Sequence, residues 1–267
     1  MKNTVFFPKF GFEIKINNIA FEIMKFKIYW YGIIICFGTL LAIFYGFHEC
    51  EKKKIKSDDV SNMLLIGMPI SIFCARFYYV CFKFEDFKER KFLEIINIRE
   101  GGIAIYGAII GAIITGLIYT KIKKIPFLPL LDIFGICLLI GQSIGRWGNF
   151  INCEAYGTHT NLPWAMSISG QINANNVHPT FLYESLWNAL GILILNLYKK
   201  NIKFKGELFC AYMFWYGIGR TFIEEIRADS LMFFSFKISQ VLSIIITLIG
   251  LSIILFKRFK KINNQLN

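Results

Sequence analysis

The stretch from Gly145 to Gly157 places several polar side chains beside a run of apolar residues. It contains Arg146, Asn149, Asn152 and Glu154 among three glycines. The planar guanidinium of an arginine can donate two parallel, charge-assisted hydrogen bonds to a phosphate. If the apolar run crosses a membrane, a phospholipid head group lies at the depth of this segment. We therefore interpret the stretch as an anion site, the alternative being a plain turn with a structural arginine.

A second set of polar residues repeats at helical spacing. Tyr216, Arg220, Glu224 and Arg227 are separated by four, four and three positions, which places them on one face of a helix. Inside an apolar bundle, such a face points to the interior or to a wet cavity. Glu224 can pair with either arginine, so a purely structural role for that ion pair stays open.

Three arginines fall within or at the ends of apolar stretches, namely Arg76, Arg146 and Arg220. An arginine at the centre of a membrane helix costs at least about 2.5–3.5 kcal/mol, so each of them indicates a functional site by default. For Arg76, which lies close to the end of its stretch, a structural ion pair or snorkelling explains the residue equally well.

Two further segments carry polar groups at the start of apolar stretches. His178 precedes Glu184, and a carboxylate within an apolar stretch needs a partner or a proton. Tyr106 lies beside Gly107, which together with Gly111 has the spacing that permits close helix packing.

The composition predicts a membrane protein. Hydrophobic residues make up 55% of the 267 positions and charged residues 18%, with a mean hydropathy of +0.50, whereas soluble domains are about 45–50% apolar and about 25% charged. The seven cysteines form no CxxC pair and most are interpreted as small core residues, while Cys153, in a polar segment, is assigned no role. The first 28 residues lack the apolar region and cleavage site of a cleavable signal peptide.

Membrane-spanning helices need about 20 predominantly apolar residues, and the sequence offers seven such segments. We therefore expect an all-α integral membrane protein with seven transmembrane helices. The predicted spans run approximately over residues 29–47, 60–82, 101–120, 127–146, 180–198, 206–226 and 238–256.

The distribution of basic residues predicts the orientation. The connections at 48–59, 121–126, 199–205 and 257–267 carry 15 Lys and Arg in 36 positions, whereas those on the other side carry 12 in 90. The positive-inside rule makes the denser side cytoplasmic. The amino terminus then lies outside and the carboxyl terminus in the cytoplasm. The formal charge of +12 is thereby explained as topogenic charge, and nucleic-acid binding is set aside.

Three regions flank or connect the predicted spans. Residues 1–28 form a short outer arm, in which residues 12–16 and 19–23 alternate in polarity and predict a hairpin across Asn17-Asn18 that anchors at the membrane surface. Residues 29–256 form the transmembrane catalytic domain, with a long outer loop at 147–179 that contains no Lys or Arg. Residues 257–267 form a basic cytoplasmic tail.

These segments together resemble the prolipoprotein diacylglyceryl transferase family. Its signature, approximately G-R-x-G-N-F-[IL]-N-x-E-x-x-G, is matched at nine positions of a thirteen-residue window, by Gly145, Arg146, Gly148, Asn149, Phe150, Ile151, Asn152, Glu154 and Gly157. The resemblance covers nearly the whole chain in order, through Trp30-Tyr31-Gly32, the Gly-Gly segment at 101–102, His178-Pro179 with Tyr183-Glu184, and Tyr216-Gly217 with Arg220.

The resemblance implies an enzyme of the bacterial inner membrane. It would transfer the sn-1,2-diacylglyceryl group of phosphatidylglycerol to the lipobox cysteine of a prolipoprotein, as the first step of lipoprotein maturation. The products would be a thioether and sn-glycerol 1-phosphate. Its partners would be phosphatidylglycerol, prolipoprotein signal peptides and the lipid bilayer, its active site would face outward, and no metal or cofactor is expected.

The resemblance also implies roles for individual residues. Arg146 would bind the phosphate of phosphatidylglycerol, and Arg220 would flank it. The remaining substrate-binding residues would be Tyr31, Asn149, Asn152, Gly157, His178 and Tyr216. Many family members carry a histidine, proposed as the base, where this chain has Tyr106. A tyrosine is a poor base near neutrality unless an arginine lowers its pKa, so Tyr106 or Glu154 is expected to assist loss of the thiol proton.

Other classes of membrane protein fit less well. A transporter for an anionic solute would also line a cavity with Arg and Tyr and is the second hypothesis, although paired broken helices are absent from the pattern. A rhomboid-type protease would need a G-x-S-G nucleophile, which the loop string ending at Gly170 lacks. A CDP-alcohol phosphatidyltransferase needs several spaced Asp residues, and the spans offer essentially Asp132. A retinal sensor needs a lysine within the last span, where residues 239–255 contain none.

Overall fold

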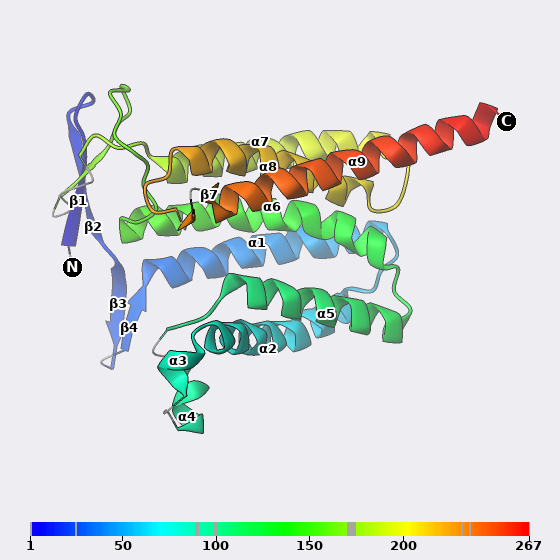
Figure 1. Ribbon diagram of the computed structural model, residues 1–267, viewed down its shortest axis with the longest axis horizontal. Coiled ribbons are helices and arrows are strands. Elements are labelled where there is room, and N and C mark those ends of the chain that lie inside the picture. The colour runs from blue at the N-terminus through cyan, green and yellow to red at the C-terminus, as the bar shows by residue number, and fades with distance from the viewer. Residues whose placement is uncertain are drawn as a thin grey trace. The chain divides into compact units, whose positions relative to one another are not determined.

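The computed structural model describes residues 2–24, 26–88, 91–98, 101–169, 175–230, 232–234 and 236–266. It divides into two compact units, one made of Met1–Gly46 and Leu131–Asn267 and the other of Phe47–Leu130. Long helices dominate both (Figure 1). Among the described residues, six helices are long and apolar enough to cross a membrane: α1 (Trp30–Lys52), α2 (Ser57–Phe82), α5 (Ile105–Lys123), α6 (Phe127–Asn152), α7 (Thr180–Tyr198, followed by the 3-10 helix η2, Lys199–Asn201) and α9 (Ile238–Leu266).

The remaining predicted span is also a helix, α8 (Glu207–Glu225). It does not qualify as a span by length and composition, because charged residues stand at its start (Glu207), in its body (Arg220) and at its end (Glu224 and Glu225). The described structure is thus mostly helical with six candidate spans, which is consistent with the expected all-α membrane protein, and α8 is a further, charged helix.

In the first unit, α8 packs against α7 and α9, and α6 runs beside this group (Figure 1). Their shared core contains Ile136 and Leu139 of α6, Leu195 of α7 and Leu208 of α8. The carboxyl-terminal half of α8 and the amino-terminal half of α7 lie at one end of this bundle, while the basic connection at 199–205 lies at the other. The bundle therefore separates a polar end from a basic end.

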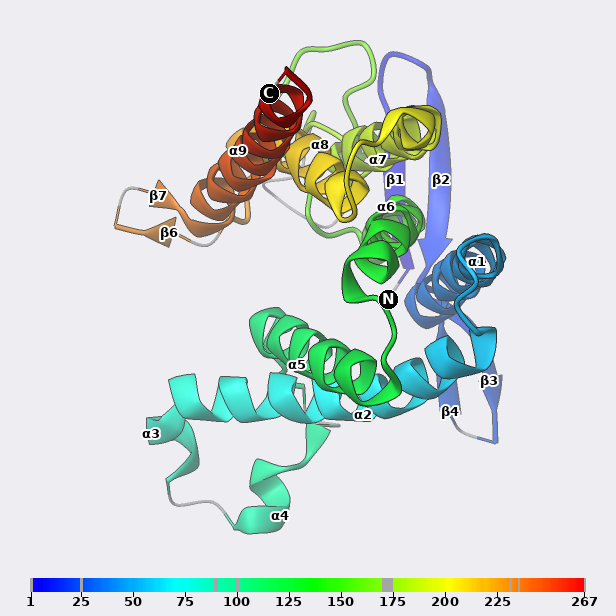
Figure 2. The same cartoon turned by 90° about the vertical axis from the view of Figure 1, so that its right-hand side faces the viewer.

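In the second unit, α2 packs closely against α5, and two short helices, α3 (Phe84–Phe87) and α4 (Phe92–Ile95), follow α2 (Figure 2). The contact uses the predicted small-residue pair. A Cβ atom added at Gly107 would lie 2.8 Å from the Cα of Ala75, and one added at Gly111 would lie 2.9 Å from the Cα of Ser71. The two backbones meet at glycines because no larger residue leaves room.

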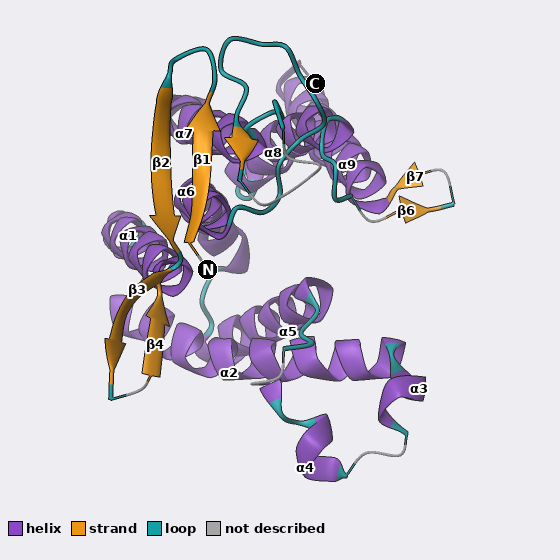
Figure 3. Ribbon diagram, turned by 90° about the vertical axis from the view of Figure 1, so that its left-hand side faces the viewer, coloured by secondary structure: helices purple, strands orange, loops and turns teal. Residues whose placement is uncertain are grey.

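The amino-terminal arm forms two hairpins, so the predicted single hairpin across Asn17-Asn18 is wrong. Strand β1 (Lys2–Phe7) pairs antiparallel with β2 (Phe12–Asn17), and β3 (Ile19–Ile23) pairs with β4 (Phe26–Tyr29) (Figure 3). The first reversal occurs before β2, where Gly11 has a φ of 67° and its amide donates to the carbonyl of Phe7. Gly11 tolerates the left-handed backbone that this turn requires, whereas Asn17-Asn18 leads from one hairpin into the next.

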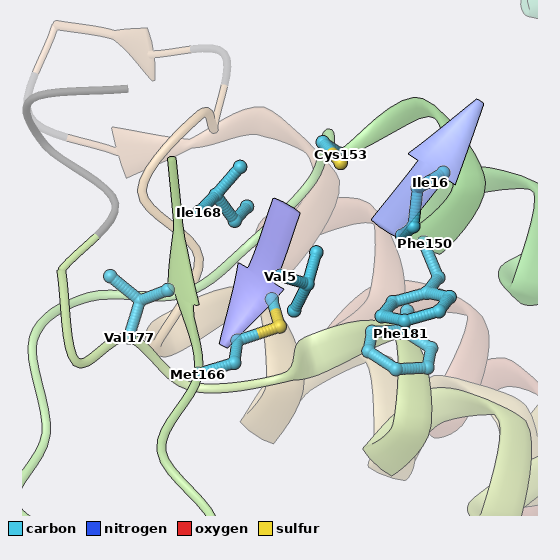
Figure 4. Close-up of a cluster of buried hydrophobic side chains, with 8 residues drawn as sticks. All are labelled: Val5, Ile16, Phe150, Cys153, Met166, Ile168, Val177 and Phe181. Carbon is cyan, nitrogen blue, oxygen red and sulfur yellow. The ribbon is translucent and has the colours of Figure 1, made fainter. Parts of the chain in front are cut away.

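The first hairpin is joined to the outer loop by a third strand, β5 (Ser167–Ile168), which pairs with β1 (Figure 3). A further short hairpin is formed by β6 (Met232–Phe233) and β7 (Phe236–Lys237). Beneath the three-stranded sheet lies a cluster of buried apolar side chains (Figure 4): Val5, Ile16, Phe150, Cys153, Met166, Ile168, Val177 and Phe181. The arm is thus packed onto the ends of α6 and α7.

Helix α6 extends to Asn152, so the outer loop begins at Cys153 and not at residue 147 as predicted. Residues 147–152 include no proline, and they continue the helix. It ends where Cys153 adopts a φ of 56°. The amide of Glu154 then donates to the carbonyl of Asn149 (3.0 Å) and that of Cys153 to Phe150 (3.0 Å). These two bonds form a Schellman motif with cysteine in the position that glycine usually takes.

One other predicted boundary is also wrong. Helix α5 begins at Ile105 instead of residue 101, because Gly101 and Gly102 both have positive φ values, which a right-handed helix does not accept. Helix α9 continues as far as Leu266, so most of the predicted basic tail at 257–267 is helical.

Candidate active site

Arg146 lies near the carboxyl-terminal end of α6 and its guanidinium is held by two neighbours. One terminal nitrogen donates to Oδ1 of Asn149 (3.1 Å) and the other donates to Oε1 of Glu184 (2.6 Å). The side chain is 22% exposed, so it reaches the surface of its unit while its charge is balanced from the inside. Two of the five N–H donors of an arginine are used in these contacts.

Glu184 connects Arg146 to the second arginine of the site. Its Oε1 accepts from Arg146, and its Oε2 accepts from Arg220 at 2.8 Å. The carboxylate is 3% exposed, and a buried carboxylate keeps its charge only when it is paired and hydrogen-bonded. Helix α7 thus supplies the counter-ion for arginines on α6 and α8.

The ion-pair network continues along α8 as its helical spacing predicts. Arg220 also contacts Glu224 (2.6 Å), and Glu224 lies 3.9 Å from Arg227. Arg227 in turn makes a bidentate pair with Asp229, at 3.0 and 2.9 Å. Burial raises the pKa of Asp229 and the contacts with Arg227 lower it, with a net lowering. The three arginines of the network face three carboxylates, so their formal charges cancel.

Asn149 links this network to a fourth carboxylate, Glu154. Its side-chain amide donates to Oε1 of Glu154 at 2.8 Å, and the amide of Asn152 donates to the same oxygen at 3.4 Å. The α6 terminus positions all three residues, because the Schellman motif at Cys153 turns Glu154 back over the last helical turn. The amides therefore leave Glu154 fixed and exposed beside Arg146.

A groove of about 940 Å³ begins at this carboxylate. Its polar end is lined by Asn18, Asn152 and Glu154, and the rest follows α1 with mostly apolar side chains, among them Cys36 and Leu40. Tyr31 lines the same groove, and its ring lies against Gly148, where an added Cβ would come within 2.7 Å of it. A cavity with a polar mouth and an apolar length suits an amphiphilic ligand.

Gly157 and His178 lie on the other side of the network, in the loop that precedes α7. The amide of Gly157 donates to the carbonyl of His178 (2.9 Å), and the residue pairs with Arg227 as an isolated β-bridge. A Cβ at Gly157 would lie 2.6 Å from that of His178. The His178 imidazole is 3.1 Å from the Tyr183 hydroxyl, and burial lowers the pKa of His178. Gly157 thus allows the loop to approach the arginine network closely.

Tyr216 lies on α8, one helical turn before Arg220. Its ring stacks on that of Tyr212, with centroids 5.8 Å apart, and the hydroxyl of Tyr212 accepts a hydrogen bond from Gln142 at 3.1 Å. These polar rings extend the site from the ion pairs into the core of the bundle. Within the described part of the chain, no group of three His, Cys, Asp or Glu side chains could hold a metal ion.

Comparison with known sequences identifies what this arrangement is similar to. The sequence model of the prolipoprotein diacylglyceryl transferase family matches residues 18–256. The chain belongs to this family. A phosphatidylglycerol–prolipoprotein diacylglyceryl transferase of Bacillus cytotoxicus is 43% identical over 252 residues, which cover 91% of this chain and 93% of that protein. Enzymes with the same name match from Listeria monocytogenes (42% identity, 92% and 91% covered) and Clostridioides difficile (42%, 93% and 98%).

As a member of the prolipoprotein diacylglyceryl transferase family, the chain is a transferase. Most of the residues predicted as its site come together in the first unit: Tyr31, Arg146, Asn149, Asn152, Glu154, Gly157, His178, Tyr216 and Arg220. Tyr106, the remaining one, lies in the second unit, in the first turn of α5. Its side chain is 37% exposed and its ring is 6.4 Å from that of Tyr78.

The most important residue absent from the predicted site is Glu184, the carboxylate between the two family arginines. The sequence contains a signal for it, since a carboxylate inside an apolar stretch needs a partner. The sequence does not say which partner, because Arg146 and Arg220 lie 38 and 36 positions away. Asp229 is likewise absent from the predicted site and joins the network through its pair with Arg227.

Proposed function

We propose that the chain transfers the sn-1,2-diacylglyceryl group of phosphatidylglycerol to the lipobox cysteine of a prolipoprotein and releases sn-glycerol 1-phosphate. The observation that carries this proposal is the placement of Arg146 and Arg220 about Glu184. Beside these arginines, Asn149 and Glu154 lead to a groove that suits an amphiphilic ligand. The names of the relatives support the donor and the acceptor.

The reaction exchanges one bond to a glyceryl carbon for another. The cysteine sulfur forms a bond to the carbon that carries the phosphodiester, and the bond from that carbon to the phosphate oxygen breaks. The diester becomes a phosphomonoester and gains negative charge. Arg146 and Arg220 would bind this developing charge more strongly than the charge of the diester, and binding that strengthens in the transition state accelerates the reaction.

The thiol proton must leave as the new bond forms, and Glu154 or Tyr106 would assist its removal. Glu154 is exposed beside the groove and held by Asn149 and Asn152. By the resemblance, Tyr106 would occupy the position at which many family members carry histidine. Tyr31, Gly157, His178 and Tyr216 would shape the site that receives the lipid. Replacing Glu154 with Gln and Tyr106 with Phe tests the two candidates, since the true base causes the larger loss of turnover.

The proposed topology has seven spans, with α8 included, the amino terminus outside and the site at the outer face. Two features of the first unit support this arrangement. The arginine network and the β1-β2-β5 sheet share one end of the α6–α8 bundle, and the basic residues Lys199, Lys200 and Arg258 lie at the end where α7 finishes. Basic residues favour the cytoplasmic side, so the site would face outward at the plasma membrane.

Purified protein in phosphatidylglycerol vesicles provides the test. We expect a lipobox peptide to gain the mass of a diacylglyceryl group, with release of glycerol phosphate, and a peptide with Cys changed to Ser to remain unmodified. Arg146→Ala and Arg220→Ala should each lower turnover by about 10²–10³-fold, the usual effect of removing one charge-stabilising donor. Lys121→Ala, an exposed residue of α5, is the matched control.

Two results would contradict the proposal in different ways. Normal turnover in both arginine variants would show that these residues do not bind the reacting phosphate. Absence of any mass shift in wild-type protein that demonstrably binds phosphatidylglycerol would exclude the transferase activity, and a flux assay in the same vesicles would then test the anion-transport hypothesis.

A further inference from the structure

The side chain of Arg76 binds the backbone on both sides of the connection between α4 and α5. Nε of Arg76, on α2, donates to the carbonyl of Ile95 (2.7 Å), and one terminal nitrogen donates to the carbonyls of Gly101 (2.8 Å) and Gly102 (2.9 Å). The other terminal nitrogen donates to the carbonyl of Glu94 at 3.3 Å. The guanidinium thus binds backbone from both ends of the segment, and Arg76 is only 6% exposed.

Two aromatic rings complete the surroundings of this guanidinium. Its central carbon lies 5.9 Å from the centroid of Tyr79 and 5.1 Å from that of Phe87, and the two rings meet edge to face. Carbonyl oxygens and aromatic faces both stabilise a cation. Arg76 therefore has the partners that keep a buried charge in place, without serving as a surface ion pair.

The Gly-Gly segment has the conformation that these hydrogen bonds require. Gly101 and Gly102 have φ values of 80° and 74°, in the region that favours glycine. A Cβ on Gly102 would lie 2.6 Å from a terminal nitrogen of Arg76 and 2.7 Å from the ring of Tyr79. Both carbonyls can therefore reach one arginine because glycine accepts the positive φ at both positions and because Gly102 carries no side chain.

The Gly101-Gly102 segment leads directly to Tyr106. The amide of Ala104 donates to the carbonyl of Ala75 (3.1 Å), α5 begins at Ile105, and Gly107 contacts the backbone of α2 around Ala75. Tyr106 thus lies between two attachments to α2, and the hydrogen bonds from Arg76 to Gly101 and Gly102 immediately precede the first of them.

We propose that Arg76 is a positioning residue that acts through the Gly101-Gly102 segment to place Tyr106 for the transfer reaction. This inference rests on the proposed function, in which Tyr106 is one of two candidates for the group that removes the thiol proton. Arg76 itself binds backbone and does not touch the reacting atoms. A methionine at this position would fill similar space between Tyr79 and Phe87 but would release four carbonyls.

The test is a double-mutant cycle of Arg76→Met and Tyr106→Phe, measured as vesicle turnover of the lipobox peptide. A small displacement of a reacting group costs up to about 10²-fold in rate, so kcat should fall by about that factor in Arg76→Met. We expect KM for phosphatidylglycerol to change by less than about threefold, because binding by the arginines of the first unit is untouched. Arg76→Lys should recover part of the loss, since an ammonium can donate to some of the carbonyls.

The double variant separates positioning from an independent effect. If Arg76 acts through Tyr106, Arg76→Met should cause no further loss in Tyr106→Phe protein. Deuterium exchange at the amide of Ala104 should be faster in Arg76→Met and unchanged in the Lys121→Met control. Gly102→Ala should reproduce the exchange and kcat effects of Arg76→Met by displacing the same guanidinium.

Three results would overturn the inference. One is a normal kcat in Arg76→Met, and another is multiplication of the two losses in the double variant. A third is normal turnover in Tyr106→Phe, which removes the group that Arg76 is proposed to place but leaves the transferase activity standing. Failure of wild-type protein to transfer at all would instead contradict the proposed function.

Discussion

Glu184 divides its two carboxylate oxygens between Arg146 and Arg220, which come from different helices. Without it, two guanidinium groups would face each other in a buried place with no shared counter-ion. The cost of breaking a buried ion pair by removing one partner exceeds the benefit that the pair itself gives, because an unpaired charge is left behind. Glu184 therefore holds both phosphate-binding candidates in place.

Replacing Glu184 with Gln should both destabilise the protein and impair turnover. The amide cannot neutralise two arginines, and breaking a buried pair costs about 3–5 kcal/mol. Thermal unfolding in detergent and turnover in vesicles measure the two effects. Glu85→Gln is the matched control, since its pair with Lys88 is exposed and such pairs contribute about 0–1 kcal/mol. Equal stability of the two variants would show that Glu184 is not the shared counter-ion.

At the scale of elements, the distance between α7 and α8 is set by two tryptophans that pack reciprocally. Trp187 of α7 donates its indole N–H to the carbonyl of Trp215 (3.0 Å), and Trp215 of α8 donates to the carbonyl of Trp187 (3.1 Å). Their rings stack with centroids 4.4 Å apart. Each ring lies over a glycine of the other helix, Trp187 over Gly219 and Trp215 over Gly191.

Gly219→Ala should therefore separate α7 from α8 and weaken the contact between Glu184 and Arg220. An added methyl at Gly219 would overlap the Trp187 ring, and overpacking of this kind costs about 1–3 kcal/mol. We expect a lower melting temperature together with reduced turnover. Gly141→Ala is the control in the neighbouring helix, because a methyl added there would meet no atom within 4 Å. A melting temperature as high as that of the control would show that the tryptophans do not set this distance.

For the whole molecule, the prediction is that the two chain ends lie on opposite sides of the membrane. An odd number of spans follows only if α8 crosses the bilayer despite its charges. Its ion pairs face inward and leave apolar residues such as Phe222 (71% exposed) on the outer surface of the helix bundle, which makes that crossing possible. In cysteine-free protein, a membrane-impermeant maleimide should label Phe10→Cys in intact protoplasts but label Asn264→Cys only after lysis. Labelling of both positions before lysis would mean an even number of spans.

Much of this protein could be predicted from its sequence. Apolar runs of sufficient length identify the helices, since hydrocarbon leaves few alternatives to a helix, and the spacing of Tyr216, Arg220, Glu224 and Arg227 gives their common face. The signature around Arg146 gives the family. These inferences succeed because each depends on residues that are near one another in the chain.

Tertiary structure decided what depends on contacts between distant segments. The carboxylate that pairs with Arg146 and the strand β5 that pairs with β1 are determined by packing, as are the carbonyls that surround Arg76. The start of α5 belongs to the same class, because Gly102 adopts left-handed backbone with its carbonyl bound to the distant Arg76. The sequence by itself determined which side chains could do chemistry, and folding decided which of them form ion pairs with one another.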